Sequence, residues 1–186
     1  MKNELKEALT TLKSKNLILY PTDTVWGIGC DATNSKAVQK IYQLKQRDES
    51  KSLVILVDSI KMLNQYINII PKKVTKILSE AKKPTTIVYG KTEGLAKNVI
   101  AKDNTVAIRI VQDKFCEELI KQFGKPIVST SANISGESTP KSFKEISPKI
   151  LKGVDYIVNL HHEKININPS CIIKLNDDGS IKIIRE

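Results

Sequence analysis

The chain has 186 residues, enough for one domain with a sizeable core, and 40% of its residues are hydrophobic. No apolar run approaches the roughly 20 residues that span a bilayer, and the polar N-terminus does not resemble a signal peptide. We therefore expect a cytoplasmic protein that does not enter a membrane. The formal net charge of +10 favours an anionic ligand such as a nucleotide or RNA, unless it reflects a lysine-rich composition alone.

Short β-branched runs alternate with amphipathic stretches, which is typical of an α/β fold. The first part of the chain predicts a helix over 3–15, a strand over 17–20, a polar, glycine-bearing loop over 22–34 and a helix from Ser35, its N-cap, to about Leu44. The middle part predicts a buried strand at 53–57, helices at 59–67 and 72–82, and strands at 85–89 and 105–110.

The last part of the chain predicts a helix at 113–123, a strand at 126–130, a turn-rich stretch to Pro140, a helix at about 142–151 and strands near 154–159, 170–175 and 181–185. Asp178-Gly179 is typical of the turn of a closing hairpin between the last two strands. The elements predict an open α/β domain over residues 1–186, with a mixed sheet of about seven strands and flanking helices. The order of the strands cannot be read from the pattern.

Two residue types stand out. Only three of the 30 basic residues are arginine, namely Arg47, Arg109 and Arg185. Arginine offers a planar fork that grips carboxylate or phosphate oxygens, so these residues indicate an anion site unless they form structural salt bridges. The three cysteines lie far apart without metal-ligand spacing, and we expect free, buried thiols in a reducing compartment.

Familiar nucleotide, zinc and hydrolase motifs are absent from the sequence. Gly27-Ile28-Gly29 lacks the third glycine of a dinucleotide loop, His161 and His162 lack cysteines at zinc spacing, and Ser131 lacks a nucleophile-elbow context. What remains are polar residues beside apolar strands, where open α/β sheets bind ligands, although such residues are often only turn formers. They are Thr22, Thr24, Lys45, Arg47, Arg109, Ser129, Ser131, Asn133, Ser170 and Arg185.

Three motifs, in order along nearly the whole chain, resemble the YrdC-like family of threonylcarbamoyl-AMP synthases. Residues 21–30, PTDTVWGIGC, are similar to that family's PT[DE]TVYGLG loop. Lys45-Gln46-Arg47, followed by Lys51, matches its K-x-R signature, and Ser131-Ala132-Asn133 in PIVSTSAN matches its S-x-N partner. The sequence departs from the family at Trp26, where tyrosine is common, and at 48–50, which replace a proline-containing turn.

The resemblance implies a YrdC-like fold and a reaction of L-threonine, bicarbonate and ATP, with Mg²⁺ accompanying the ATP and no identifiable metal ligands. It also implies a single domain, without the C-terminal domain of longer members, and delivery of the product to the transferase machinery that modifies tRNA. The implied ATP-binding residues are Lys45, Arg47, Thr105, Ser131, Asn133, Thr139 and Arg185, of which Lys45 and Arg47 are catalytic. The implied threonine-binding residues are Thr22, Arg109, Ser129 and Ser170.

Two alternatives remain open at this point. The net charge is also typical of a non-catalytic RNA-binding module, and direct contact with tRNA is compatible with either function, although aromatic residues for base stacking are few. A relative that makes a different carbamoyl-adenylate, as in hydrogenase maturation, would keep the ATP residues and change the amine pocket. Trp26 lines that pocket or packs in the core.

Overall fold

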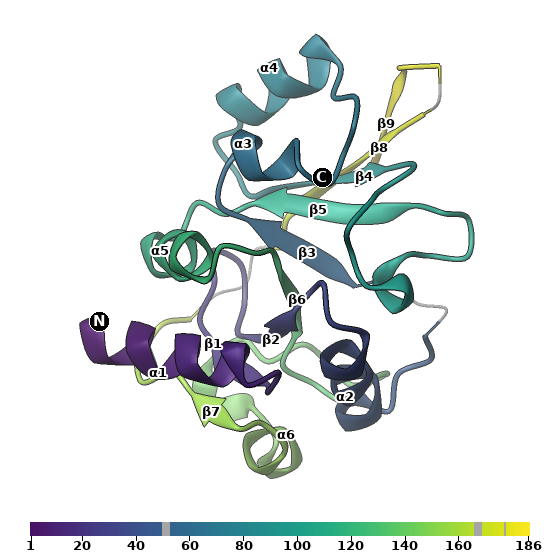
Figure 1. Cartoon of the computed structure of the whole chain (residues 1–186). Helices are drawn as coiled ribbons and strands as arrows, with labels where there is room; N and C mark the ends of the chain where they lie inside the picture. The colour runs from purple at the N-terminus through teal and green to yellow at the C-terminus, as the bar shows by residue number, and fades with distance from the viewer. Residues whose placement is uncertain (50–52, 166–168, 177) are drawn as a thin grey trace.

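The structure is a computed structural model that describes residues 1–49, 53–165, 169–176 and 178–186. Within these ranges nine strands form one sheet, in the order β7-β1-β2-β6-β3-β5-β4-β8-β9, with helices packed around it (Figure 1). The strands are β1 (Ile18–Tyr20), β2 (Gly27–Asp31), β3 (Val54–Val57), β4 (Thr85–Tyr89), β5 (Val106–Ile110), β6 (Ile127–Ser131), β7 (Tyr156–Ile157), β8 (Cys171–Leu175) and β9 (Ile181–Arg185). The helices are α1 (Lys2–Lys13), α2 (Ser35–Lys45), α3 (Ile60–Leu63), α4 (Lys72–Glu80), α5 (Lys114–Phe123) and α6 (Pro148–Gly153), with short 3-10 turns η1 (Lys97–Val99) and η2 (Phe143–Glu145).

The sheet is mixed, as the sequence predicts, because β1/β7, β3/β5 and β4/β8 pair in parallel and the other neighbours are antiparallel. The predicted α/β fold is confirmed, and the strand number is nine in the described ranges rather than about seven. The closing hairpin is also confirmed, since β8 and β9 pair antiparallel. Cys30 and Cys116 are buried free thiols, whereas Cys171 is partly exposed.

The prediction of a loop over 22–34 is wrong for β2, and its two glycines explain why. A Cβ atom at Gly29 would lie 2.7 Å from the Tyr20 ring and 2.9 Å from the Val128 carbonyl oxygen. A Cβ atom at Gly27 would lie 2.9 Å from Ser129 Oγ. Glycine at these positions therefore allows close approach of side chains and backbone from the two neighbouring strands, which a strand can require as well as a loop.

Several helix boundaries also differ from the prediction. The N-cap of α2 is Asn34 rather than Ser35, and its side chain accepts a hydrogen bond from the Ala37 N–H at 3.0 Å. The predicted helix at 142–151 is split into η2 and α6, and α6 begins at Pro148 because proline suits the first helical position. The helices predicted at 59–67 and 72–82 are the shorter α3 and α4.

The strand register gives the sheet two different faces. One face carries a continuous row of buried apolar side chains across six strands: Cys30, Val128, Ile55, Ile108, Ile87 and Ile173. The other face carries small or polar residues at many of the alternate positions, including Gly27, Ser131, Ser129, Arg109 and Thr86. Since side chains alternate along a strand, the apolar row packs in the core and leaves the polar row for a site.

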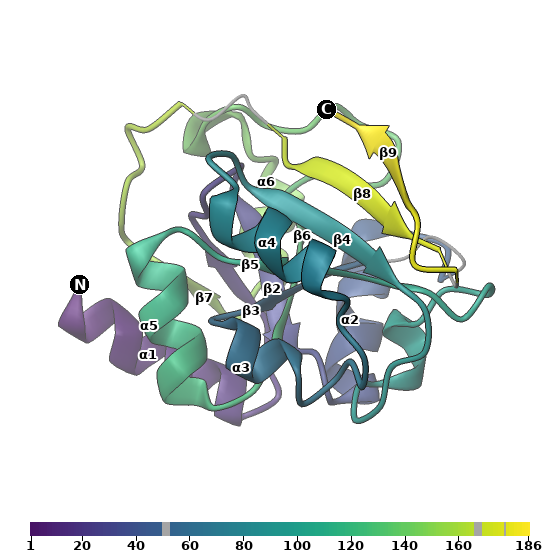
Figure 2. The ribbon, with the colours of Figure 1, turned by 90° about the horizontal axis from the view of Figure 1, so that it is seen from above.

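The helices flank this sheet at several places. In Figures 1 and 2, α1 lies alongside α5, and α1 also contacts the neighbouring strands β1 and β7. Helix α2 packs on β2, and both α3 and α5 contact β3. Among the described residues, no helix combines the length and apolar character needed to cross a bilayer.

Candidate functional site

A cavity of about 490 Å³ lies over the polar face of the sheet. It is lined by Thr24, Val25, Gly27, Arg47, Leu53, Val54, Arg109, Ser129, Thr130, Ser131, Thr139, Pro169, Ser170, Ile172 and Arg185. All three arginines of the chain are in this lining, and its described residues include no lysine and no carboxylate. Such a wall is complementary to anions, because its described residues offer three guanidinium groups and no carboxylate.

The sheet register explains how distant residues meet in this cavity. Gly27 pairs with Ser131, and Ser129 pairs with both Gly29 and Val54. Arg109 pairs with Thr86, Thr86 pairs with Ile172, and Ile172 pairs with Arg185. Arg109 and Arg185 thus belong to one cross-strand row and are separated by three strand spacings, or about 14 Å. This distance joins the two backbones, whereas the Arg185 guanidinium contacts Ser170, whose hydroxyl lies 2.8 Å from that of Thr86.

The end of α2 directs Lys45 and Arg47 to different places. Gln46, between them, adopts a left-handed conformation (φ 50°), and the N–H groups of Gln46 and Arg47 donate to carbonyls of the last helical turn. Arg47 lines the cavity. Lys45 does not, since its side chain is 1% exposed and its ammonium donates to the carbonyl oxygens of Ser131 and Asn133. Lys51 lies outside the described residues.

Burial has an electrostatic consequence for Lys45. Burial, together with the nearby Arg47, lowers the pKa of the ammonium from the usual 10.5 to about 8, and Glu137 opposes this shift. The two carbonyl oxygens that accept from the Lys45 ammonium belong to Ser131 and Asn133, the two polar residues of the S-x-N motif. Lys45 therefore connects the K-x-R and S-x-N motifs from behind the cavity wall.

The S-x-N motif divides in a similar way. Ser131 lines the cavity at the end of β6. Asn133 does not, because its amide donates to the carbonyl oxygens of Ile134 (3.0 Å) and Glu137 (2.8 Å) and closes the following turn. Its Oδ1 is buried without a hydrogen-bond partner among the described residues.

The buried end of the cavity is organised around Arg109, which is 4% exposed. Its Nη1 donates to Thr24 Oγ1 at 3.2 Å, and its Nη2 lies 3.0 Å from Asp23 Oδ1. Thr22 donates its hydroxyl to the Val25 carbonyl oxygen at 2.7 Å and lies 3.0 Å from the Thr24 hydroxyl. Because a hydroxyl has one hydrogen, Thr24 donates to Thr22 and accepts from Arg109. Thr22 thus orders this loop from beneath and is not itself in the lining.

Ser170 joins two other parts of the wall. It is 4% exposed, and its hydroxyl lies 2.8 Å from that of Thr86. Its carbonyl oxygen accepts from Arg185 Nε at 3.0 Å and Nη2 at 2.8 Å. These bonds fix the last strand's arginine at the cavity edge, where Thr139 also lines the wall.

Thr105 and Trp26 lie elsewhere. Thr105 donates its hydroxyl to Asp103 Oδ1 at 2.7 Å, before the first residue of β5, and it does not line the cavity. Trp26 is 1% exposed and packs at ring-centroid distances of 5.0 Å from Phe143 and 5.3 Å from His162. Trp26 therefore packs in the core and does not line the cavity.

Sequence reasoning missed Asp23 and Thr86, and it left Thr24 out of the binding set. The only local signal for Asp23 was a carboxylate between two threonines, because its partner Arg109 lies far along the chain. Thr86 was concealed in the apolar run 85–89, where a buried threonine next to the site cannot be told from one that simply suits a strand.

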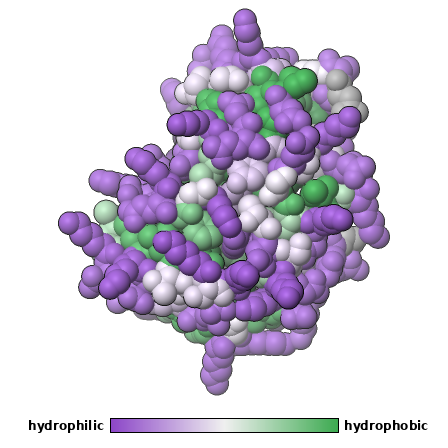
Figure 3. Space-filling model, in the orientation of Figure 1, coloured by the Kyte–Doolittle hydropathy of each residue, from purple (hydrophilic) through white to green (hydrophobic). Residues whose placement is uncertain are grey.

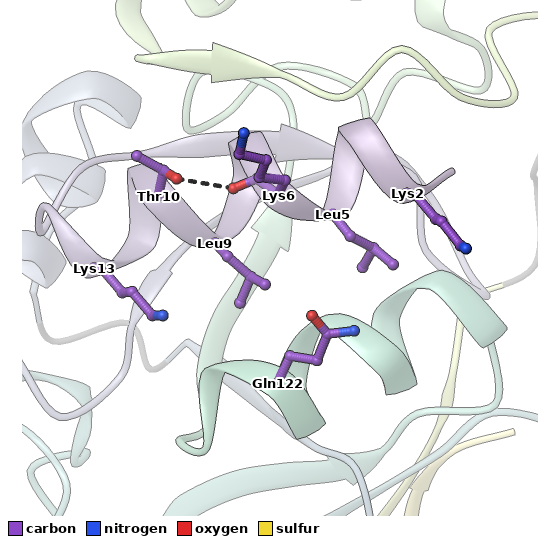
Figure 4. A pocket seen from close by; sticks show the side chains of 7 residues that line it. All are labelled: Lys2, Leu5, Lys6, Leu9, Thr10, Lys13 and Gln122. Carbon is purple, nitrogen blue, oxygen red and sulfur yellow. Dashed lines mark hydrogen bonds between the residues drawn. The ribbon is translucent and has the colours of Figure 1, made fainter.

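A second hollow, of about 390 Å³, lies between α1 and α5 (Figure 4). Its lining consists of Lys2, Leu5, Lys6, Leu9, Thr10, Lys13 and Gln122. In Figure 4, Leu5 and Leu9 point toward Gln122 on the opposite helix, and Figure 3 shows a hydrophobic area in this region of an otherwise largely hydrophilic face. It shares no lining residue with the arginine cavity and contains none of the predicted site residues.

Comparisons with known proteins agree with the motifs. The family model Sua5_yciO_yrdC, described as "Telomere recombination", matches residues 10–186. The threonylcarbamoyl-AMP synthase of Pseudoalteromonas translucida is 34% identical over 82% of this chain and 83% of its own. That of Photobacterium profundum is 32% identical over 80% and 82% of the two chains.

Solved structures have the same fold. Sua5 of P. abyssi, crystallised in complex with L-threonine, matches with a TM-score of 0.87 and 25% identity over 97% of this chain, which spans about half (53%) of that protein. YciO of E. coli matches with a TM-score of 0.86 over 100% of this chain and 90% of its own, at 21% identity. The family model and the relatives together show that the chain belongs to the Sua5/YciO/YrdC family.

Proposed function

We infer that the chain is a threonylcarbamoyl-AMP synthase, which forms threonylcarbamoyl-AMP and pyrophosphate from L-threonine, bicarbonate and ATP for the threonylcarbamoyladenosine modification of tRNA. The observation that carries this function is that the chain's three arginines all line one cavity free of carboxylates among its described residues. The names of the curated relatives agree with it.

We propose that the cavity has two halves. The buried half, around Arg109, Ser129 and Ser170, takes threonine, and Arg109 faces its carboxylate. The more open half takes ATP, through Arg47, Ser131, Thr139 and Arg185. The presence of two separately held guanidinium groups supports this division, because a carboxylate and a triphosphate repel each other and need separate cations.

The chemistry then requires positioning rather than a protein nucleophile. The threonine amine attacks bicarbonate with loss of water, or carbon dioxide with loss of a proton. An oxygen of the resulting carbamate then attacks the α-phosphate of ATP and displaces pyrophosphate. The reactants are all anions or bear anionic groups, so their mutual repulsion is the main obstacle. Fixed guanidinium groups and hydroxyl donors offset that repulsion and hold the carbamate in line with the phosphate.

Lys45 and Asn133 support the nucleotide half in this proposal. Lys45 holds the carbonyls of the S-x-N motif, and the Asn133 amide closes the next turn, so both set the position of Ser131. Thr22 has the same relation to the threonine half, through Thr24. Thr105, which lies outside the cavity lining, is not needed for it.

We propose that Mg²⁺ enters with ATP. No group of three or more His, Cys, Asp or Glu side chains within the described ranges could hold a metal, and the described cavity wall contains no carboxylate. The described residues of the cavity wall therefore do not supply the carboxylate ligands of a protein-built Mg²⁺ site. Mg²⁺ commonly keeps several waters and binds substrate phosphates, so the triphosphate itself is the appropriate carrier.

The test is pyrophosphate release by the purified chain with ATP, bicarbonate and L-threonine. We expect release that depends on threonine and a product with the mass of threonylcarbamoyl-AMP. Equal release without threonine, or none with all three substrates, would refute the proposed function. A thermal-shift series with threonine, serine and carbamoyl phosphate separates this activity from the synthesis of another carbamoyl-adenylate.

We further propose that the product passes to the transferase machinery for tRNA, and that the net charge of +10 supports a direct RNA contact. Binding of tRNA that weakens steeply with salt is the expected result. Binding that is insensitive to salt would contradict the electrostatic contact without affecting the catalytic proposal.

A further inference from the structure

Arg109 is a nearly buried cation whose side chain is held by two neighbours in the loop after β1. Asp23 Oδ1 lies 3.0 Å from its Nη2 in an ion pair that does not have hydrogen-bond geometry, and Thr24 Oγ1 accepts from its Nη1 at 3.2 Å. The remaining nitrogen, Nε, is buried without a hydrogen-bond partner among the described residues. These two contacts restrict the orientation of the guanidinium and leave at least three of its five N–H groups for other acceptors.

Asp23 is itself held on both sides. Its side chain is 8% exposed, and its other oxygen, Oδ2, accepts from the Gln112 N–H at 3.2 Å. Gln112 lies just after β5, the strand that carries Arg109. The Asp23 carboxylate thus connects the loop after β1 to the end of β5, the strand that carries Arg109. This connection is present without a bound substrate.

We propose that Asp23 is the positioning residue for threonine binding: it holds the Arg109 guanidinium in the plane that receives the carboxylate of the amino acid. This inference rests on the proposed function, which places threonine beside Arg109. Asp23 does not line the cavity and acts only through the arginine. If the Arg109 side chain were unrestrained, the ligand would have to order it, and the lost side-chain entropy would weaken binding. An arginine that is already held in place avoids this cost.

Calorimetry with two ligands separates positioning from a general structural role. L-threonine carries the carboxylate, and L-threoninamide lacks it. We expect Asp23→Ala to raise the Kd for threonine by at least about tenfold, the effect of losing one aligned charge-assisted hydrogen bond, and to change the Kd for threoninamide less than about twofold. Asp23→Asn keeps an oxygen toward Arg109, and we expect its Kd for threonine to stay within about threefold of the wild-type value.

Asp31 provides a matched control. Its carboxylate is also shielded (7% exposed) and ion-paired, to Lys125 at 3.2 Å, but it does not line the cavity. We expect Asp31→Ala to leave both dissociation constants unchanged. Equal weakening of both ligands in Asp23→Ala would show a structural role alone and overturn the proposal. Tighter threonine binding would show that Asp23 competes with the ligand for Arg109, and would overturn it as well.

A readout without any ligand distinguishes failure of this proposal from failure of the proposed function. Because the chain has only three arginines, its arginine Nε–H groups give three ¹⁵N signals, which arginine-to-lysine variants assign. We expect the Arg109 signal to be rigid by heteronuclear NOE in the wild type and flexible in Asp23→Ala. An Arg109 signal of equal rigidity in both proteins would overturn the positioning role. A rigid wild-type Arg109 with no threonine binding would instead refute the proposed function.

Discussion

Replacement of Lys45 by methionine tests whether its ammonium is buried behind the cavity wall or accessible to a phosphate. Burial lowers the pKa of Lys45 to about 8 in the folded protein, against the usual 10.5 that applies to the unfolded chain. Below about pH 8 both states carry the charge, and folding bears the full cost of burying it. As the pH rises from about 8 to about 10.5, the folded protein loses the proton first, and that cost disappears.

The wild type should therefore gain stability relative to Lys45→Met as the pH rises. From the two pKa values, the difference in unfolding free energy should shift by about 2.5 kcal/mol between about pH 7 and about pH 10 in favour of the wild type. Urea unfolding of both proteins at several pH values measures this shift. Titration of other groups occurs in both proteins and cancels in the difference.

Lys45→Met also loses the hydrogen bonds to the carbonyl oxygens of Ser131 and Asn133. This loss changes the difference in unfolding free energy by an amount that does not depend on pH. Lys36→Met, which removes an exposed lysine of the same helix, controls for the loss of a lysine from α2. A difference between wild type and Lys45→Met that stays constant from about pH 7 to about pH 10 would refute the reasoning. It would mean that the ammonium is well solvated, as a direct phosphate ligand could be.

Three other predictions concern the packing and the wall of the cavity. Gly29→Ala should lower the unfolding free energy by about 1–3 kcal/mol, because its Cβ would lie 2.7 Å from the Tyr20 ring; an unchanged urea midpoint would contradict this contact. Arg47→Ala should reduce threonine-dependent pyrophosphate release at least roughly 100-fold in the folded protein; full activity would remove Arg47 from the nucleotide half. Trp26→Ala should cost about 3–5 kcal/mol of stability, whereas Trp26→Phe should leave the threonine Kd unchanged; weaker binding by a stable Trp26→Phe would place the ring at the site.

The sequence predicted most elements of the fold because their hydrophobic periods are clear. It failed at β2, where Gly27 and Gly29 look like a loop and instead make room for Tyr20, Ser129 and the backbone of β6. That requirement comes from neighbouring strands whose order the sequence does not contain, so no local pattern could reveal it.

The candidate site was predictable to a similar extent. The motifs identified Arg47, Arg109 and Arg185, and the structure brings all three into one cavity. They could not show that the Lys45 ammonium turns toward carbonyl oxygens, because that depends on the left-handed Gln46 and on where β6 ends. Asp23 remained unnoticed for the same reason, since its partner is a strand 86 residues further along the chain.

The position of β6 between β2 and β3 has a consequence for how the chain folds. β2 and β3 are consecutive in the sequence, yet neither pairs with the other, and both leave an edge that only residues 127–131 fill. Until this late strand inserts, the two earlier strands expose unpaired backbone groups, which are a hazard for aggregation. The inserting strand carries Ser129 and Ser131, so the step that protects the sheet from self-association is also the step that completes the arginine-lined cavity.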